Sequence, residues 1–167
     1  MFILYQFLLT LLLILSPLII CFRVLKKKED KKRFKEKFCL PSKKRTTGNL
    51  IWFHCSSVGE LLSILSLVKK IEKNKSINQI LITTSTLSSA QIFKNFNFKK
   101  TIHQFFPIDS IFFSYKFLNY WRPTIAIFVE SEIWPCIFKV LREKNIPLKL
   151  LNARITKKTF KKWKRVK

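Results

Sequence analysis

The chain has 167 residues and a formal net charge of +24 at pH 7, from 33 Lys and Arg against 9 Asp and Glu. Because 48% of the residues are hydrophobic, the composition excludes a globally disordered chain and predicts one domain with a real core, plus an appendage. The charge points to an anionic partner such as nucleic acid, a phospholipid surface or a phosphorylated substrate, although an overall bias towards Lys, Ile, Phe and Asn explains part of it equally well.

The first 24 residues predict a membrane anchor. Residues 2–22 are apolar and carry no charge, and Arg23 and Lys26 follow at once. At ~1.5 Å per helical residue, this run is long enough to span a bilayer, and the basic flank predicts that the rest of the chain faces the cytoplasm. A cleaved signal peptide is the competing interpretation, but it requires a basic residue before the apolar run and small residues at a cleavage site.

Residues 25–48 are rich in lysine, as in "KKKEDKKRFKEKFCLPSKKR". We expect a short helix at the membrane surface that ends at Pro41, and a solvated linker is the alternative. The four cysteines (Cys21, Cys39, Cys55 and Cys136) are widely spaced, and neither they nor the two histidines form a zinc pattern, so reduced and mostly buried thiols are expected.

From residue 49 onwards, apolar runs alternate with segments of helical periodicity. Strands are predicted over 50–55, 79–85, 103–109, 124–130 and 147–153, and helices over 60–73, 88–96, 110–121 and 133–145. This alternation predicts an α/β fold, a Rossmann-like parallel sheet with helices on both faces over residues 49–167. The chain has no Gly-x-Gly-x-x-Gly or Walker sequence, so the common phosphate-cradling loops are absent.

The segments that follow the five strands are polar or acidic: "HCSSVGE", "TTSTLSS", "FPIDS", "VESEIWP" and "LNARIT". Ligands of open parallel sheets bind beyond the carboxyl ends of the strands. Four of the nine acidic residues, Glu60, Asp109, Glu130 and Glu132, lie there. Taken alone, each is explained as well by a structural role, as a first-turn helix residue or a loop residue, as by a functional one. Four of them together indicate a site.

Glu60 is the candidate general base. A carboxylate at the start of a helix is favoured as an anion by the nearby backbone N–H groups and can take a proton from an attacking hydroxyl. Gly59 would let a substrate approach the backbone closely, and Ser56 and Ser57 are placed to cap the helix or to donate to a ligand. A serine nucleophile is disfavoured because the Gly-x-Ser-x-Gly elbow is missing.

The motifs "HCSSVGE", "ITTSTLSS", "FFPID", "VESEIWP" and "NARIT" resemble, in order and spacing, those of the 3-deoxy-D-manno-octulosonic acid (Kdo) transferases of lipopolysaccharide synthesis. The resemblance implies the amino-terminal domain of a two-domain GT-B glycosyltransferase. It also implies an inverting transfer of Kdo from CMP-Kdo to a phosphorylated lipid A precursor (lipid IVA), without cofactor or metal, at the cytoplasmic face of the inner membrane. Nucleic acid is not an expected partner, because the candidate site is acidic.

The resemblance also implies roles for individual residues. Glu60 matches the general base, and Glu130 matches a glutamate that stabilises the transition state, while Trp134 and Pro135 would hold the loop in shape. Substrate-binding roles are expected for residues within the matched motifs: Ser57, Gly59, Thr84, Asp109, Glu132, Asn152 and Arg154.

The sequence departs from the family in three places. Leu87 and Ser89 replace a proline and a glycine of the second motif, and Cys39 stands where glycine is common. We further expect the chain to be about half of a family member that lacks the donor-binding domain, so that it needs a separate chain or is inactive alone. A membrane-anchored basic module that binds anionic lipid or nucleic acid without catalysis is the alternative function.

Overall fold

The computed structural model describes residues 19, 22–23, 26, 29–130 and 133–153, and these form one five-stranded parallel sheet with helices. The strands are β1 (Leu50–Cys55), β2 (Gln79–Thr84), β3 (Thr101–Phe105), β4 (Ile125–Val129) and β5 (Leu148–Leu151). The helices are the 3₁₀-helix η1 (Phe34–Phe38) and the α-helices α2 (Val58–Glu72), α3 (Leu87–Lys94), α4 (Ile111–Trp121) and α5 (Pro135–Glu143).

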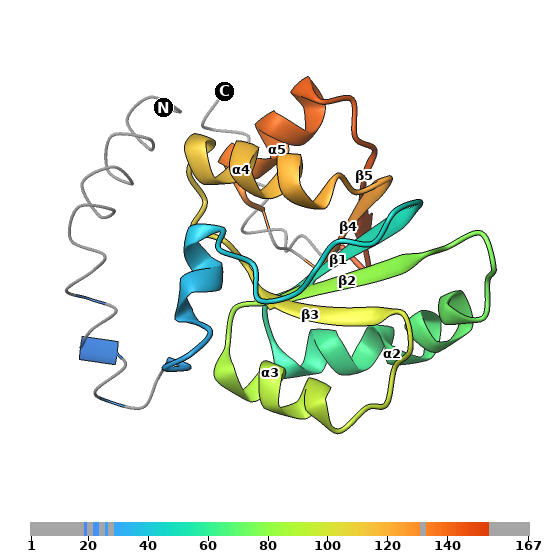
Figure 1. Cartoon of the computed structure of the whole chain (residues 1–167), viewed down its shortest axis with the longest axis horizontal. Helices are drawn as coiled ribbons and strands as arrows, with labels where there is room; N and C mark the ends of the chain where they lie inside the picture. The colour runs from blue at the N-terminus through green and yellow to red at the C-terminus, as the bar shows by residue number, and fades with distance from the viewer. Residues whose placement is uncertain (1–18, 20–21, 24–25, 27–28, 131–132, 154–167) are drawn as a thin grey trace.

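The strand order is β3-β2-β1-β4-β5, and all four strand pairs are parallel. Helices α2 and α3 cover one face of the sheet and α4 and α5 cover the other (Figure 1). The predicted α/β, Rossmann-like fold is therefore confirmed. Because the chain moves outwards from β1 to β3 and then returns to β4, the direction of the strand order reverses between β1 and β4, which is where open α/β sheets bind ligands.

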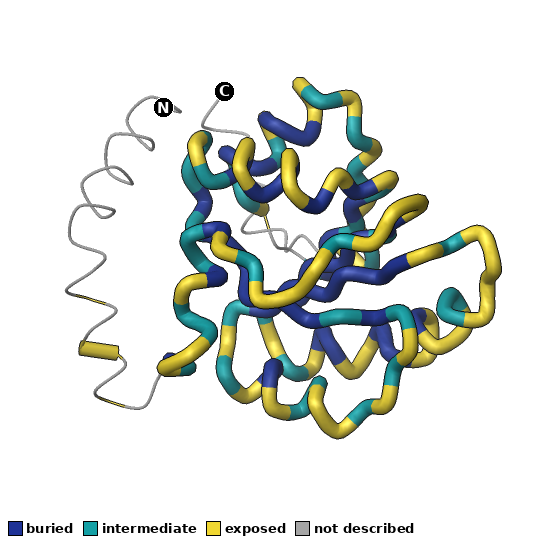
Figure 2. Tube along the Cα trace, viewed as in Figure 1, coloured by how far each residue is buried: buried dark blue, intermediate teal, exposed yellow. Residues whose placement is uncertain are grey.

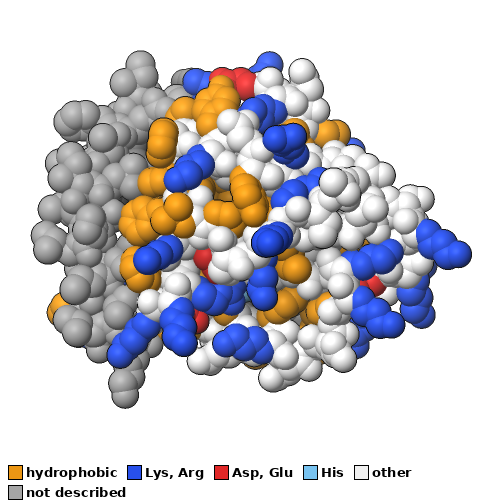
Figure 3. All heavy atoms as spheres, viewed as in Figure 1, with side chains coloured by type: hydrophobic (Ala, Val, Ile, Leu, Met, Phe, Trp, Pro, Cys, Tyr) orange, Lys and Arg blue, Asp and Glu red, His pale blue; other side chains and the backbone are white. Residues whose placement is uncertain are grey.

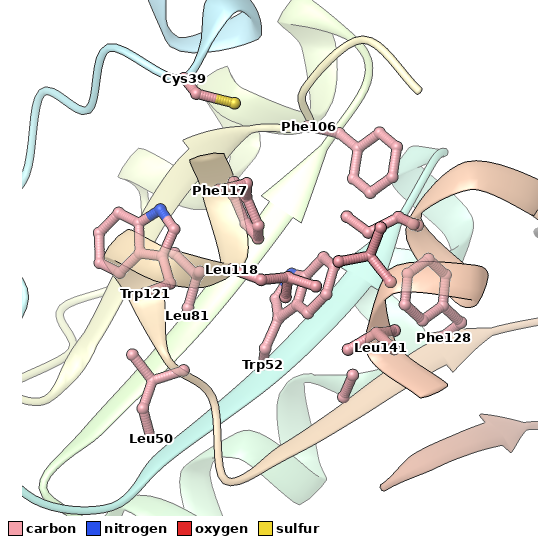
Figure 4. Packing of buried hydrophobic residues seen from close by; sticks show 13 residues of the cluster. Cys39, Leu50, Trp52, Leu81, Phe106, Phe117, Leu118, Trp121, Phe128 and Leu141 are labelled. Carbon is pink, nitrogen blue, oxygen red and sulfur yellow. The ribbon is translucent and has the colours of Figure 1, made fainter. Parts of the chain in front are cut away.

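Strand β1 builds both halves of the core, because successive side chains point to opposite faces. Trp52 packs with residues of α4 and α5 (Figure 4). Phe53 packs with residues of α2 on the other face. Both side chains are fully buried, as is most of the central sheet (Figure 2). The strands are apolar on both faces because helices cover both, which is why they appear in the sequence as continuous apolar runs.

Four helices are predicted at nearly their observed positions, but β3 is shifted. It begins at Thr101 and ends at Phe105, whereas 103–109 was expected. Phe106 still donates its N–H to the carbonyl of Thr84 at 2.9 Å, and Pro107 then ends the pairing, since proline has no N–H to donate. The predicted anchor over 1–24 falls almost entirely outside the described residues, none of which forms a helix long and apolar enough to cross a membrane.

The basic segment, residues 25–48, packs against the domain through Arg33 and Glu36. Glu36 of η1 is 3% exposed, binds Arg33 through two hydrogen bonds of 2.7 and 2.9 Å, and accepts the Phe105 N–H at 2.8 Å. Arg33 also donates to the carbonyl oxygen of His103 at 2.8 Å. At the start of β3, Glu72 of α2 accepts the N–H of Thr101 at 2.9 Å. This part of the segment is therefore not a solvated linker.

Cys39 ends η1 in the left-handed conformation, with a φ of 56°. Glycine adopts such a φ without strain, which gives a physical reason for the glycine that the family resemblance leads us to expect at this position. The thiol is 8% exposed and donates to the carbonyl of Phe113 at 3.1 Å. Cys39, Cys55 and Cys136 are all buried and reduced, as the sequence predicted, and burial raises the pKa of Cys39 and of Cys136 to about 12.

Candidate active site

Glu60 lies at the beginning of α2, in reciprocal contact with the residue that caps the helix. The Ser57 hydroxyl accepts the Glu60 N–H at 3.2 Å and donates to Glu60 Oε1 at 2.8 Å. The backbone N–H of Ser56 donates to Oε2 at 2.8 Å. The carboxylate is thus held by a donor on each oxygen and is only 7% exposed. This is a variant of the capping box in which the carboxylate accepts the N–H of Ser56 in place of that of the N-cap Ser57. Glu60 therefore has a structural role at the start of α2, and the same contacts fix its carboxylate after β1.

Gly59 is exposed and leaves open space at the start of α2. A Cβ built on Gly59 would meet only Ser57 Oγ, at 4.0 Å. The backbone φ of Gly59 is not in the left-handed region, so the local conformation does not require glycine. The missing side chain therefore leaves room at the surface of the helix terminus for an approaching group.

The loops after neighbouring strands contact one another. Ser56, after β1, and Ser85, after β2, lie with their hydroxyl oxygens 3.5 Å apart. Trp134, in the loop between β4 and α5, packs its ring 4.9 Å from that of Phe106 after β3. The segments that follow these four strands therefore lie at the same edge of the sheet, which is the edge where ligands of open parallel sheets bind.

Glu130 and Asn152 directly follow β4 and β5, and both have a left-handed backbone, with φ values of 61° and 55°. Asparagine tolerates this conformation, but for glutamate it is uncommon and carries strain of the kind that gathers at functional sites. The Glu130 N–H donates to the carbonyl of Leu151 at 2.8 Å, which holds the two strand ends together. Glu132 and Arg154, the other candidates in these loops, lie outside the described residues.

Asp109 is buried and caps a helix that is distant in sequence. Its two oxygens accept the N–H groups of Cys136 at 3.2 Å and Ile137 at 2.9 Å, in the first turn of α5. Trp134, the N-cap residue of α5, contributes no side-chain cap of its own. Asp109 therefore sets the start of α5.

Thr84 ends β2, and its hydroxyl lies 2.8 Å from His103 Nε2. Arg33 Nη2 lies 2.9 Å from the other ring nitrogen, Nδ1. Because a guanidinium can only donate, Nδ1 is the acceptor and the ring proton sits on Nε2, facing Thr84. Burial, reinforced by the charges of Arg33 and Lys94, lowers the pKa of His103 to about 3. The Thr84 side chain is fully buried in this chain of contacts.

His54 is a site feature to which the sequence assigned no role, and it packs against Trp134, which the family resemblance implies holds its loop in shape. His54 is fully buried at the end of β1, stacked on Phe106 with ring centroids 3.9 Å apart and 5.9 Å from the ring of Trp134. Its Nδ1 lies 3.0 Å from the Thr83 hydroxyl, and burial lowers its pKa to about 3. A histidine in an otherwise apolar strand was the available signal. Its neutral ring supports the loop that contains Trp134.

The sequence profile of the family described as "3-Deoxy-D-manno-octulosonic-acid transferase (kdotransferase)" matches residues 32–167 of the chain. The chain belongs to the Kdo transferase family. A Kdo transferase of Rickettsia bellii is 42% identical over 165 residues, which cover 98% of this chain and 39% of that protein. A probable mitochondrial Kdo transferase of Arabidopsis thaliana is 39% identical over 89% of this chain and 34% of its own length.

A more distant Kdo transferase, from Haemophilus influenzae, is 29% identical over 95% of this chain and 38% of its own length. The chain thus spans roughly two fifths of the length of these relatives. The observed sheet, with Glu60 and Glu130 after its two central strands, is the part of a Kdo transferase that the shared sequence covers.

Proposed function

We propose that this chain forms the acceptor side of an inverting Kdo transfer, from CMP-Kdo to a hydroxyl of a phosphorylated lipid A precursor (lipid IVA). Residues 49–167 would be the amino-terminal domain of a GT-B enzyme, and the donor would be held by a second domain that its longer relatives have room for. Residues 1–24 would anchor the chain in the inner membrane, with residues 25–48 at its cytoplasmic surface.

One observation supports this proposal above the others. Glu60 and Glu130 follow β1 and β4, the two strands between which the strand order reverses. A substrate bound beyond the carboxyl ends of these strands would therefore have a carboxylate from each side. The open space beside Gly59 lies at the same helix terminus.

In the proposed reaction, Glu60 takes the proton of the acceptor hydroxyl as that oxygen attacks the anomeric carbon of Kdo. The bond from that carbon to the CMP phosphate breaks, CMP leaves with the electron pair, and the proton remains on Glu60 until solvent removes it. The donors from Ser56 and Ser57 hold the carboxylate in a fixed orientation, which is what a general base requires. Glu130 would stabilise the transition state, and Ser57, Gly59, Thr84, Asp109, Glu132, Asn152 and Arg154 would shape or contact the acceptor site.

The test is transfer by the chain co-expressed with the region of the Rickettsia bellii relative that lies beyond the aligned residues. Transfer of labelled Kdo from CMP-Kdo to lipid IVA is measured. E60Q should lower the rate by roughly 10²-fold or more, the usual contribution of a general base, while binding of lipid IVA persists.

The matched control is E143Q, which changes an exposed glutamate at the far end of α5 and should leave the rate unchanged. Equal rates for E60Q and E143Q would remove Glu60 from the role. Absence of both transfer and lipid IVA binding in the unmutated pair would overturn the proposed function and leave a non-catalytic module.

A further inference from the structure

Helix α4 exposes a face on which large apolar side chains recur at helical spacing. Phe112, Tyr115 and Tyr120 are 69%, 38% and 39% exposed, and Phe112 is the most exposed large apolar side chain among the described residues. The opposite side of α4 carries the buried Phe117 and Trp121. Core packing therefore accounts for one side of this helix and leaves the aromatic side to be explained.

A stretch of the basic segment, residues 38–43, lies alongside this face. The ring of Phe38 meets that of Phe113 edge-on, with centroids 5.8 Å apart, and the Tyr120 hydroxyl donates to the carbonyl of Lys43 at 3.0 Å. Leu40, between these two contacts, is 51% exposed. The stretch and the helix thus form one surface, seen in Figure 3 as apolar side chains bordered by Lys and Arg.

This surface, the α4 face, consists of Leu40, Lys43, Phe112, Tyr115, Lys116 and Tyr120. Both lysines are exposed. The carboxylate nearest to it, Glu143, accepts the Tyr115 hydroxyl and lies 3.8 Å from Lys139, so its charge is offset within the domain. The α4 face therefore combines apolar and aromatic groups with a net positive charge.

We propose that the α4 face lies against the anionic surface of a lipid bilayer. An exposed phenylalanine can enter the boundary between headgroups and acyl chains, tyrosines favour the interface, and lysines attract anionic headgroups. The order of segments along the chain also supports a bilayer as the partner of the α4 face, because the predicted membrane span directly precedes the basic segment, which forms one side of this face. The inference rests on the membrane attachment in the proposed function, and it assigns the orientation of the domain on the membrane.

The test places a fluorescent reporter on the α4 face of the full-length chain. With C21S removing the one cysteine outside the described residues, F112C is labelled with an environment-sensitive dye, since the three remaining native cysteines, Cys39, Cys55 and Cys136, are buried. The matched control is L67C, which labels an exposed leucine of α2 on the other side of the sheet. Both are reconstituted in vesicles of phosphatidylglycerol and phosphatidylethanolamine that contain a quencher in the acyl chains.

The dye at position 112 should shift to shorter wavelength and be quenched severalfold more than the dye at position 67. K43E/K116E should reduce this quenching, whereas K70E/K73E, the same charge change on α2, should not. Equal quenching at the two positions would overturn the proposal, as would a shift that appears without vesicles and grows with protein concentration, which would show a second copy on this face. The dye reports how the domain lies on the membrane and does not report turnover. The proposed membrane contact and the proposed transfer activity can therefore fail independently.

Discussion

The Ser57 hydroxyl and Glu60 bond each other in both directions, the hydroxyl accepting the Glu60 N–H and donating to Glu60 Oε1. One pair of residues therefore both begins α2 and orients the proposed base. The structural and the catalytic interpretation of Glu60 are not alternatives here, because the cap is what fixes the carboxylate.

S57A should therefore lower both stability and turnover. The change removes the cap, which typically costs about 1 kcal/mol, and it removes one of the two donors to the carboxylate. Urea unfolding of the chain measures the first effect and Kdo transfer by the complemented enzyme measures the second. S57T keeps the hydroxyl and should restore most of both, so a threonine variant as impaired as S57A would contradict the dual role.

G59A should separate stability from function. Alanine is the better helix residue by roughly 0.5–1 kcal/mol, and the new Cβ meets only Ser57 Oγ, at 4.0 Å. The variant is therefore expected to be slightly more stable, yet to bind lipid IVA more weakly because the methyl group occupies the open space. Unchanged binding in a stabilised G59A would show that the acceptor does not approach here.

D109A should destabilise the chain by about 1–3 kcal/mol, because it leaves the buried N–H groups of Cys136 and Ile137 without this acceptor. D109N keeps one side-chain oxygen, so its stability should fall between that of the unmutated chain and that of D109A. Chemical denaturation of the three proteins gives the order. A stable D109A that cannot bind acceptor would instead place Asp109 in substrate binding.

E130G should be more stable than E130A by about 1 kcal/mol, because only glycine adopts the observed φ of 61° without a Cβ clash. Both variants should lose transfer activity if Glu130 acts on the substrate. Thermal unfolding compares their stabilities. Equal midpoints would show that the left-handed backbone at this position is not strained.

Stability should fall as the pH drops from neutral towards 4. His54 and His103 have folded pKa values of about 3, below the ordinary 6.5, so the unfolded chain binds more protons below pH 6.5. Each histidine then lowers stability by about 1.4 kcal/mol per pH unit within that range. Urea midpoints at several pH values measure the slope, which H103N should halve. A flat profile between pH 7 and 5 would show that the rings are accessible to protons in the folded state.

The helices and strands could be predicted from the sequence because apolar runs alternate with segments of helical periodicity. The region of the candidate site could be predicted because the acidic residues cluster after the strands. Tertiary contacts explain the rest. Asp109 caps a helix 27 residues away, and no local pattern records that pairing. The packing of the basic segment likewise depends on Glu36, which stands between two lysines in the sequence and accepts a backbone N–H of β3.

The contacts of that segment protect the outer side of β3. Phe106 pairs with β2, so alternate residues present their backbone groups outwards, where a strand from another molecule could add. Glu72 binds the Thr101 N–H, Arg33 the His103 carbonyl and Glu36 the Phe105 N–H. Two of these three side chains, Arg33 and Glu36, belong to the basic segment. Shortening the protein to its sheet and helices alone would remove two of these contacts, so we expect the shortened protein to be more prone to intermolecular strand pairing along β3.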